Sequence, residues 1–334
     1  RFRRNFELSR KKNKLDRLLN YLIPLHIPRV FIEGYKTSNQ LIEKTNWPRN
    51  PRVIFSSAAF FNHDLFKIWT AKKREERKTK FITMQHGSGY FFMKDFGSEY
   101  YQKKVSDKVI AWGDEKQKKI ISGFNYKFIY DQNVKHNKQG KLVFVNYEQH
   151  KHIISTGGQI ENDLRHNLYY DLVNSFFTNV KTEIVNFTVI KPQNTSLHKD
   201  KLFFEKLKLD YQQNKKSLID YFPQCRVLVI GKIVSTVFLE TLNCNIPTIV
   251  FFDKKAEFFN SKAKICVKRL QKAKIAFDDP IKAALHINRI WRDVDKWWYS
   301  KKTQREVDFF CKFFSKKTKS PVNDAFKILQ KEIL

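Results

Sequence analysis

An alternation of short apolar strands with helices runs along most of this 334-residue chain, and it restricts the possible fold more than any other feature. Runs typical of buried strands occur at 52–57, 80–85, 108–112, 141–145, 188–192, 226–231 and 247–253. Helical periodicity occurs at 64–73, 162–178, 217–221 and 236–242, and a helical tail follows from residue 279. Because strands that alternate with helices are joined by crossovers, they pair in parallel. The sequence therefore predicts an α/β protein with parallel sheets and a C-terminal helical tail.

A polar segment without periodicity, residues 130–140, separates the two sets of strands. We expect it to join an N-terminal Rossmann-like domain, residues 1–135, to a C-terminal Rossmann-like domain, residues 136–334. The chain begins with Arg1 and not with Met, which suggests a segment of a longer protein or a processed chain. We therefore expect the N-terminal domain to be incomplete.

The chain is strongly basic, since 64 Lys and Arg residues against 33 Asp and Glu residues give a formal net charge of +31. Such a charge favours a polyanionic partner, either a nucleic acid or an anionic membrane surface. The alternative is the bias of an AT-rich coding sequence, because the excess is mostly Lys, comes with many Asn, Ile and Phe, and is spread along the chain. We favour the second explanation for most of the charge. A nucleic-acid partner is then not expected, whereas peripheral association with the anionic inner face of the cytoplasmic membrane agrees with the remainder.

Several classes of protein are excluded by motifs that the sequence lacks. No apolar run approaches the ~18 residues needed to span a bilayer, and the GxGxxG and Walker A fingerprints of nucleotide-binding proteins are absent. There is no HExxH motif, and His150 and His152 lack a third metal ligand. We therefore expect no metal and no resident cofactor. The widely spaced cysteines indicate a reducing cytosol and no disulfide framework: Cys225, Cys244, Cys266 and Cys311.

The first candidate site is the end of the second predicted strand, where Gln85 is followed by His86, Gly87, Ser88 and Gly89. In open parallel sheets, ligands bind beyond the carboxyl ends of the strands. An imidazole at this place can act as a general base, because its ordinary pKa is ~6.5. The neighbouring glycines let the backbone approach a ligand closely. A tight turn around a hydrogen-bonded histidine is an equally good explanation of the pattern.

The second candidate site follows the strand at 226–231, which ends in Gly231 and precedes Ser235 and Thr236 at the start of a helix. The N–H groups and the dipole of a helix N-terminus favour a phosphate. Glu240, one turn further, could accept hydrogen bonds from sugar hydroxyls, and Lys191 at the end of another strand could neutralise a phosphate. An ordinary Ser/Thr N-cap and a solvated lysine are the structural alternatives.

Taken together, several segments resemble bacterial transferases of surface-polysaccharide and O-antigen gene clusters. The matching segments are PRVIFSS (51–57), FKIW (66–69), QHG (85–87), AWG (111–113), TVFLETLNCNIPTI (236–249), FDDP (277–280), IWRDVDKWW (290–298) and FFC (309–311). More distantly, the strand ending in Gln-His-Gly and the late phosphate-binding loop are similar to the CDP-glycerol glycerophosphotransferases of teichoic acid synthesis. Both groups have the GT-B architecture of two Rossmann-like domains, and the resemblance implies this fold.

The resemblance implies a metal-independent glycosyltransferase that moves a sugar or polyol phosphate from a nucleotide-activated donor to a surface-polysaccharide acceptor, either a glycan or a lipid-linked glycan. In this interpretation His86 is the catalytic base that activates the acceptor. The donor and its phosphate would bind at Ser235, Thr236, Glu240, Lys191 and Gly231. The acceptor cleft would be lined by Gln85, Gly87, Ser88, Gly89, Ser56, Ser57 and Trp112.

Two segments depart from the family pattern, residues 112–114 and the loop at 256–259, and members of the family have a larger N-terminal region. Two other functions are therefore kept as alternatives. One is a non-catalytic basic module, on a degenerate transferase fold, that binds nucleic acid or anionic membrane. The other, weaker one is an epimerase of the UDP-sugar type, which would release a changed sugar without an acceptor.

Overall fold

The computed structural model describes residues 3, 13–128, 135–147, 163–192, 198–212, 216–255 and 258–333. The chain divides into two compact units, unit 1 formed essentially by residues 1–84 and unit 2 by residues 85–332. The predicted linker at 130–140 lies partly outside the described residues, and the predicted domain boundary at residue 135 stays a prediction. His150, His152 and the first half of the 256–259 loop also lie outside them.

Unit 1 contains two parallel strands preceded and joined by helices. Its elements are α1 (Lys14–His26), the 3₁₀ helix η2 (Arg29–Phe31), α2 (Tyr35–Glu43), β1 (Val53–Ser56), α3 (Ala59–Asn62), α4 (Asp64–Arg77) and β2 (Lys80–Met84). Strands β1 and β2 pair in parallel with Ile54 opposite Phe81, which confirms both predicted strands. Helix α4 starts where Nδ1 of His63 accepts a hydrogen bond from the backbone N–H of Phe66, an N-cap that the first turn needs.

Unit 2 begins with a short parallel pair of strands and their helices. These elements are α5 (Gly97–Val105), β3 (Lys108–Ala111), β4 (Ile120–Ser122) and the 3₁₀ helix η3 (Tyr126–Phe128). The strands β1 to β4 form a four-stranded sheet in chain order, in which β3 and β4 are parallel. Strand β4 was not predicted, because three residues are too few to show a periodicity.

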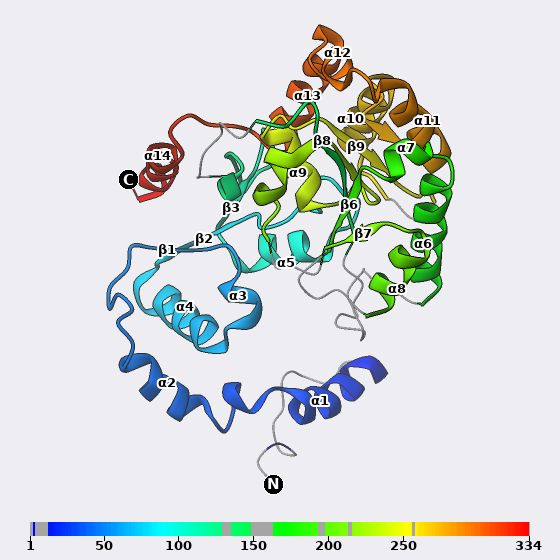
Figure 1. The fold of residues 1–334 in the computed structure, drawn as a ribbon. Coiled ribbons are helices and arrows are strands. Elements are labelled where there is room, and N and C mark those ends of the chain that lie inside the picture. Colours follow the sequence, from blue (N-terminus) through cyan, green and yellow to red (C-terminus); the bar gives the residue numbers. More distant parts are fainter. Residues whose placement is uncertain are drawn as a thin grey trace. The chain divides into compact units, whose positions relative to one another are not determined.

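The rest of unit 2 is a six-stranded sheet covered by helices on both faces (Figure 1). The strands are β5 (Lys141–Val145), β6 (Thr188–Lys191), β7 (Asp210–Tyr211), β8 (Cys225–Ile230), β9 (Thr248–Phe251) and β10 (Ala276–Phe277). Their spatial order is β10-β9-β8-β5-β6-β7, and every pair is parallel. The helices between and after them are α6 (Asp163–Phe177), α7 (Thr182–Val185), α8 (His198–Lys206), α9 (Thr236–Asn243), α10 (Ser261–Lys272), α11 (Pro280–Ile290), α12 (Val294–Trp298), α13 (Lys301–Phe314) and α14 (Pro321–Ile333).

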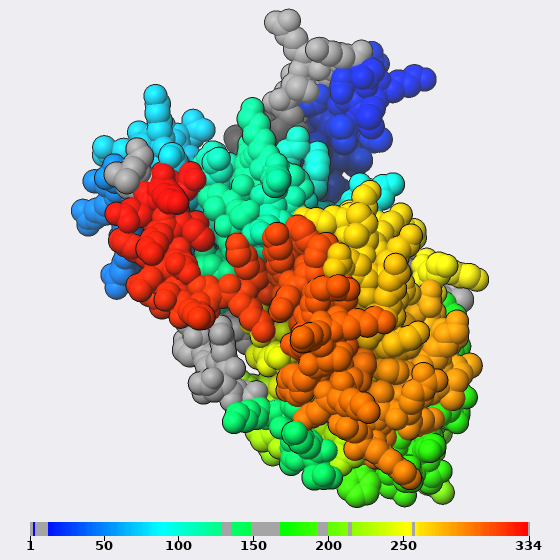
Figure 2. Space-filling view, turned by 90° about the horizontal axis from the view of Figure 1, so that it is seen from above, coloured from blue at the N-terminus to red at the C-terminus, as the bar shows by residue number. Residues whose placement is uncertain are grey.

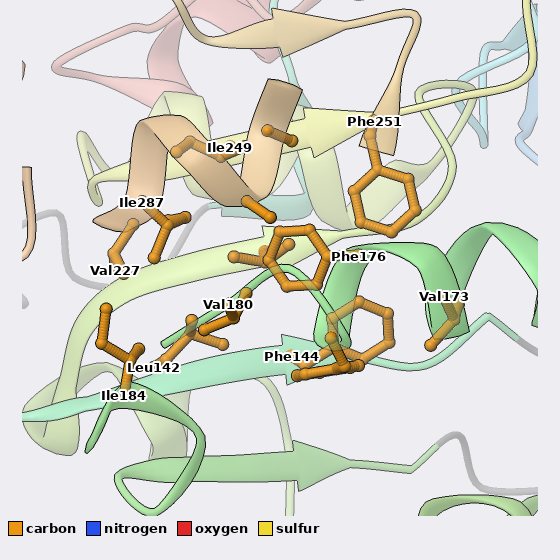
Figure 3. Packing of buried hydrophobic residues seen from close by; sticks show 14 of the residues in the cluster. Leu142, Phe144, Val173, Phe176, Val180, Ile184, Val227, Ile249, Phe251 and Ile287 are labelled. Carbon is orange, nitrogen blue, oxygen red and sulfur yellow. The ribbon is translucent and has the colours of Figure 1, made fainter. Parts of the chain in front are cut away.

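The core of unit 2 follows the period-two pattern of a sheet that is buried on both faces. Phe144 of β5 and Phe251 of β9 point toward α6, where the three rings of Phe144, Phe176 and Phe251 lie in mutual contact (Figure 3). The alternate residues Val143 and Val250 are equally buried and serve the opposite face. The apolar strand runs seen in the sequence therefore reflect burial on both faces.

The residues after α13 pack against the end of β3. The N–H of Lys316 donates to the carbonyl of Trp112 (2.7 Å), and the N–H of Asp114 donates to the carbonyl of Lys312 (2.9 Å). Between them, a Cβ added to Gly113 would lie 2.1 Å from the carbonyl oxygen of Phe313, so only glycine fits this contact. The two segments are about two hundred residues apart in the chain, and their backbones are in direct contact.

The structure confirms the predicted fold class, an α/β protein with parallel sheets of four and six strands and C-terminal helices. The helix predicted at 217–221 is instead a 3₁₀ helix, η4 (Ile219–Gln224), which contains Pro223. All four cysteines are buried thiols. Among the helices of the described residues, none has the length and apolar character that crossing a membrane requires.

Candidate functional site

The topology of the six-stranded sheet has its switch point between β5 and β8. From β5 the chain proceeds outward through β6 to β7, and from β8 it proceeds in the other direction through β9 to β10. At such a switch point the loops after the two central strands diverge, and ligands of open α/β sheets bind there. The residues that follow these strands are Asn146 and Tyr147 after β5, and Gly231 and Lys232 after β8.

Tyr169 of α6 contacts the residues that follow both of these strands. Its buried hydroxyl donates to Oδ1 of Asn146 (3.0 Å) and accepts a bond from the N–H of Tyr147 (2.9 Å). A Cβ added to Gly231 would lie 2.9 Å from Cε2 of Tyr169, so a glycine is required for close packing here. Asn146 is 1 % exposed, and its Nδ2 has no hydrogen-bond partner among the residues that the structure describes. The switch point thus holds a buried donor that a ligand could satisfy.

Two lysines contact the residues that follow β5. The ammonium of Lys232 lies 3.5 Å from the ring centre of Tyr147, a cation–π contact. Lys191 ends β6, and its carbonyl accepts a bond from the N–H of Asn146 (3.0 Å). Its side chain is buried, donates to the carbonyl of Pro192 and lies 5.8 Å from the ring centre of Tyr221. The sequence alternative of a solvated lysine is therefore wrong. Burial lowers the pKa of Lys191, and the nearby carboxylate of Glu240 opposes this effect.

The start of α9 is not capped by a side chain. Ser235 is the N-cap residue with extended backbone, yet its hydroxyl makes no capping hydrogen bond to the first turn. The alternative of an ordinary Ser/Thr N-cap is therefore wrong for Ser235. The N–H groups of the first turn, beginning at Thr236, keep the partial positive charge of a helix N-terminus, which favours an anion.

Glu240 lies in the second turn of α9 and is 5 % exposed. Its carboxylate forms an ion pair with Lys127, whose side chain is half exposed. Burial raises the pKa of Glu240, while the charges of Lys127 and Lys191 act in the opposite direction. A buried carboxylate with two cations nearby can accept hydrogen bonds from hydroxyl groups, as the sequence interpretation expects of it.

The turn after β2 is held by the side chain of Gln85, which is buried. Its Oε1 accepts a bond from the N–H of Trp112 (2.8 Å), and its Nε2 donates to the carbonyl of Gly87 (2.8 Å). A Cβ added to Gly87 would lie 3.9 Å from Oγ1 of Thr236, so the turn lies against the start of α9. The structure therefore brings together parts of the two candidate sites that are about 150 residues apart in the sequence.

His86 presents an exposed imidazole from this turn. Its Nδ1 lies 3.0 Å from the hydroxyl of Tyr90, whose ring is 1 % exposed. Partial desolvation lowers the pKa of His86, and burial, followed by the charge of Glu99, raises the pKa of Tyr90. At neutral pH the imidazole is therefore mostly uncharged and the phenol keeps its proton, which is the state that a general base requires.

The remaining predicted residues have clear structural positions. A Cβ added to Gly89 would lie 2.6 Å from the ring of Phe96, so this glycine allows close packing, and Ser88 lies in the turn itself. Trp112 is 3 % exposed, and its backbone joins the turn to the segment after α13. Ser56 and Ser57 belong to unit 1, where the hydroxyl of Ser56 accepts a bond from the N–H of Ala59 (3.0 Å) at the start of α3.

Sequence reasoning missed several residues of the site. Tyr90 and Lys232 are adjacent to predicted motifs, but nothing in their local sequence distinguishes them from ordinary turn residues. Asn146, Tyr147 and Tyr169 meet only through the sheet topology, and the position of β5 beside β8 is the one signal that could have found them. Within the described ranges, no group of three or more His, Cys, Asp or Glu side chains is arranged to hold a metal ion.

Comparison with known proteins gives one match at the level of a family and several at the level of structure. The sequence pattern of the family described as "LIC12162 family transferase" matches residues 1–329. No curated protein matches the chain.

Among the similar solved structures, two are of the wall teichoic acid polymerase TagF, and a third is of an accessory secretory protein. A histidine variant of TagF has a TM-score of 0.42 at 10 % identity, covering 97 % of this chain and 98 % of that one. Another variant, soaked for 30 minutes with CDPG, has a TM-score of 0.45 at 11 % identity, covering 96 % and 98 %. The accessory secretory protein 1, 2 and 3 structure of Streptococcus pneumoniae has a TM-score of 0.46 at 8 % identity, covering 90 % and 57 %.

Proposed function

Because this chain belongs to the LIC12162 family of transferases, we propose that it transfers a sugar or polyol phosphate from a nucleotide-activated donor to a surface-polysaccharide acceptor. In this proposal the enzyme is of the GT-B type and needs no metal ion. The donor binds at the switch point between β5 and β8, and the acceptor approaches the His86 turn.

One observation carries the proposal: the His86 turn lies against the uncapped start of α9, with the Cβ position of Gly87 3.9 Å from Oγ1 of Thr236. A base and an anion-binding helix terminus on adjoining segments suit a reaction in which a hydroxyl attacks a centre that carries a phosphate leaving group. Preorganised N–H donors stabilise the charge that develops on such a leaving group.

The donor's phosphate is placed at the first turn of α9, with Lys191 and Lys232 as the nearby cations. The unsatisfied Nδ2 of Asn146 supplies a further donor, and Glu240 accepts hydrogen bonds from the hydroxyls of the donor's sugar or ribose. Gly231 belongs to the donor site in this proposal because it lets the backbone after β8 pack closely against Tyr169.

In the chemical step, an acceptor oxygen forms a bond to the electrophilic carbon or phosphorus of the donor, and the bond from that centre to the nucleotide's phosphate oxygen breaks. The acceptor's proton moves to Nε2 of His86. For this, Nδ1 of His86 carries a hydrogen and donates it to Tyr90 Oη, which fixes the reactive tautomer. The negative charge that leaves with the nucleotide is stabilised by the helix terminus and the lysines.

We further propose that the enzyme works at the cytoplasmic side of an anionic membrane, where lipid-linked acceptors are presented. The net charge of +31 supports this location, because basic proteins are attracted to anionic leaflets. The residues that this proposal assigns to the acceptor are Gln85, Gly87, Ser88, Gly89, Ser56, Ser57 and Trp112.

The test begins with the melting temperature of the protein in the presence of CMP-, CDP-, UDP- and GDP-linked donors. A donor at 100 times its Kd adds about 2.7 kcal/mol to the native state, which raises the melting temperature by a few degrees. The donor that binds is then used in a transfer assay with the His86→Ala variant and, as a control, with His26→Ala on exposed α1.

We expect His86→Ala to abolish transfer while it leaves donor binding intact, and His26→Ala to change neither. The absence of a shift with every donor would contradict the donor site. Unchanged transfer by His86→Ala with intact donor binding would contradict the role of the base.

A further inference from the structure

A second basic region lies on unit 2, in a groove between α10 and α13. These helices form adjoining parts of the amber and orange surface in Figure 2. The groove has a volume of about 690 Å³. Five of the six side chains that line it are cationic: Arg269, Lys272, Lys274, Lys302 and Arg305, with Glu306 as the single carboxylate.

The two arginines of the groove bond to the same carboxylate, that of Glu306. Nε of Arg269 donates to one carboxylate oxygen of buried Glu306 (2.5 Å), and Nε of Arg305 donates to the other (3.0 Å). The guanidinium of Arg269 also stacks 3.6 Å from the ring centre of Phe309. Both arginines use only Nε in these bonds, and their terminal nitrogens make no hydrogen bond with any residue that the structure describes.

A guanidinium fixed through Nε presents its remaining N–H groups as a planar fork that matches the oxygens of a phosphate. Two such forks share one carboxylate here, so the ordering of both side chains is achieved before any ligand arrives. This reduces the entropy that a ligand would have to offset on binding.

The three lysines of the groove add charge without internal compensation. Lys272, Lys274 and Lys302 are exposed, and none of them forms an ion pair within the described part of the chain. The lining therefore carries five positive charges and one negative charge. Like charges gathered in one concavity raise the local potential and favour an anion over water.

We propose that this groove binds a flexible polyanion that carries several phosphate groups. Phosphate is favoured because the two arginines offer forks, and several phosphates are favoured because the cations come from two helices and not from one point. A chain is favoured over a bilayer because the cations line a concave groove between helices, which a flat surface cannot enter. The inference is independent of the proposed function, since it requires neither the proposed donor site nor His86.

The test measures binding of inorganic polyphosphate to the intact protein by calorimetry over a range of salt concentrations. The groove variant is Lys272→Glu with Lys302→Glu. The control is Lys36→Glu with Lys44→Glu, two exposed lysines of and beside α2 that carry the same change of charge. A third variant, Arg305→Lys, keeps the charge of the groove and removes one fork.

We expect the groove variant to weaken polyphosphate binding by at least ~10-fold and to lower the slope of log K against log salt by about 1.4, which is ~0.7 for each lost contact. The control should change affinity by less than about 2-fold, because general charge attraction is screened at working salt. Arg305→Lys should weaken binding although the net charge is unchanged.

Three results would overturn the proposal. Equal losses in the groove and control variants would show that net charge alone attracts the polymer. Orthophosphate binding as tightly as polyphosphate would show a site for a single ion. Vesicles of anionic lipid that bind through the groove lysines, without polyphosphate binding, would show a membrane-docking surface instead.

Discussion

The hydroxyl of Tyr90 lies 3.0 Å from Nδ1 of His86, and it comes from a ring that is buried beside Phe91, Val109 and Ala111. The buried ring fixes the position of the hydroxyl, and the hydroxyl in turn orients an imidazole that is itself exposed. The pair therefore joins a buried ring to an exposed imidazole, and a hydrogen bond to one ring nitrogen of a histidine can select its tautomer.

We expect Tyr90→Phe to remove this orientation while it keeps the packing of the ring. Transfer activity should fall by ~10-fold, a share of the usual contribution of general base catalysis. The ¹⁵N chemical shifts of the His86 ring, measured at pH 8, should show a change in the balance of the two tautomers. Tyr100→Phe, at an exposed tyrosine of α5, serves as the control. Unchanged tautomer populations in Tyr90→Phe would contradict the role of Tyr90.

Gly231→Ala tests the close packing at the end of β8. The new Cβ would lie 2.9 Å from the ring of Tyr169, and we expect a loss of about 1 to 3 kcal/mol in the free energy of unfolding from this overpacking. Gly97→Ala is the matched control, because no atom lies within 4 Å of its Cβ position at the start of α5. That variant should be neutral or slightly more stable. Urea titrations of both variants give the comparison, and equal stabilities would contradict the packing argument.

The burial of His286 makes the stability of the protein depend on pH. It is buried against Phe277 and Trp297, and burial, followed by the charges of Arg289 and Lys274, lowers its pKa to about 4. In the unfolded chain the histidine has its ordinary pKa of about 6.5. Between pH 4 and pH 6.5 the unfolded state therefore binds more protons than the folded state. Titration of His286 therefore leaves the free energy of unfolding unchanged above pH 6.5. As the pH falls toward 4, it lowers this free energy by up to about 3 kcal/mol.

His286→Leu should make the unfolding free energy less dependent on pH between 7 and 4. The exposed histidine of α1 provides the control, since His26→Leu should leave the pH dependence as it is in the parent protein. Stability is measured by urea denaturation at each pH. A pH profile that His286→Leu does not alter would show that other groups cause the acid sensitivity.

We expect the buried hydroxyl of Ser315 to have a large effect on the stability of the protein. Its Oγ donates to the carbonyl of Leu239 (3.0 Å) and accepts bonds from Nδ2 of Asn125 (3.0 Å) and of Asn243 (3.2 Å). Ser315→Ala leaves these buried groups without that partner, which costs about 1 to 3 kcal/mol. Ser320→Ala, at an exposed serine nearby, should cost almost nothing. The two melting temperatures give the test, and equal values would contradict the importance of the network.

The strands and most of the helices could be predicted because burial on both faces leaves a local trace. Phe144 and Phe251 belong to apolar runs that are visible in the sequence, and the helix at 162–178 was confirmed as α6. The two-residue strands β7 and β10 leave no such trace, because a pair of residues shows no periodicity. Their positions depend on pairing with β6 and β9.

The candidate site could be predicted only where chemistry coincides with the end of a strand. His86 and Lys191 follow that rule, and Thr236 starts the helix after such a strand, whereas much of their surroundings comes from residues distant in sequence. Tyr169 reaches Asn146 across 23 positions, and the burial of Lys191 depends on the packing of several segments. Such relationships are set by the tertiary structure, and the local sequence does not contain them.

The contact between the end of α13 and the end of β3 has a consequence for synthesis of the protein. Gln85 holds the His86 turn to the N–H of Trp112, and the carbonyl of Trp112 accepts its bond from the N–H of Lys316. A ribosome makes Lys316 more than two hundred residues after His86. At ~5 to 20 residues per second, more than ten seconds pass between the synthesis of the His86 turn and that of Lys316. His86 therefore reaches the setting that the structure shows only after Lys316 has been made and has packed against Trp112.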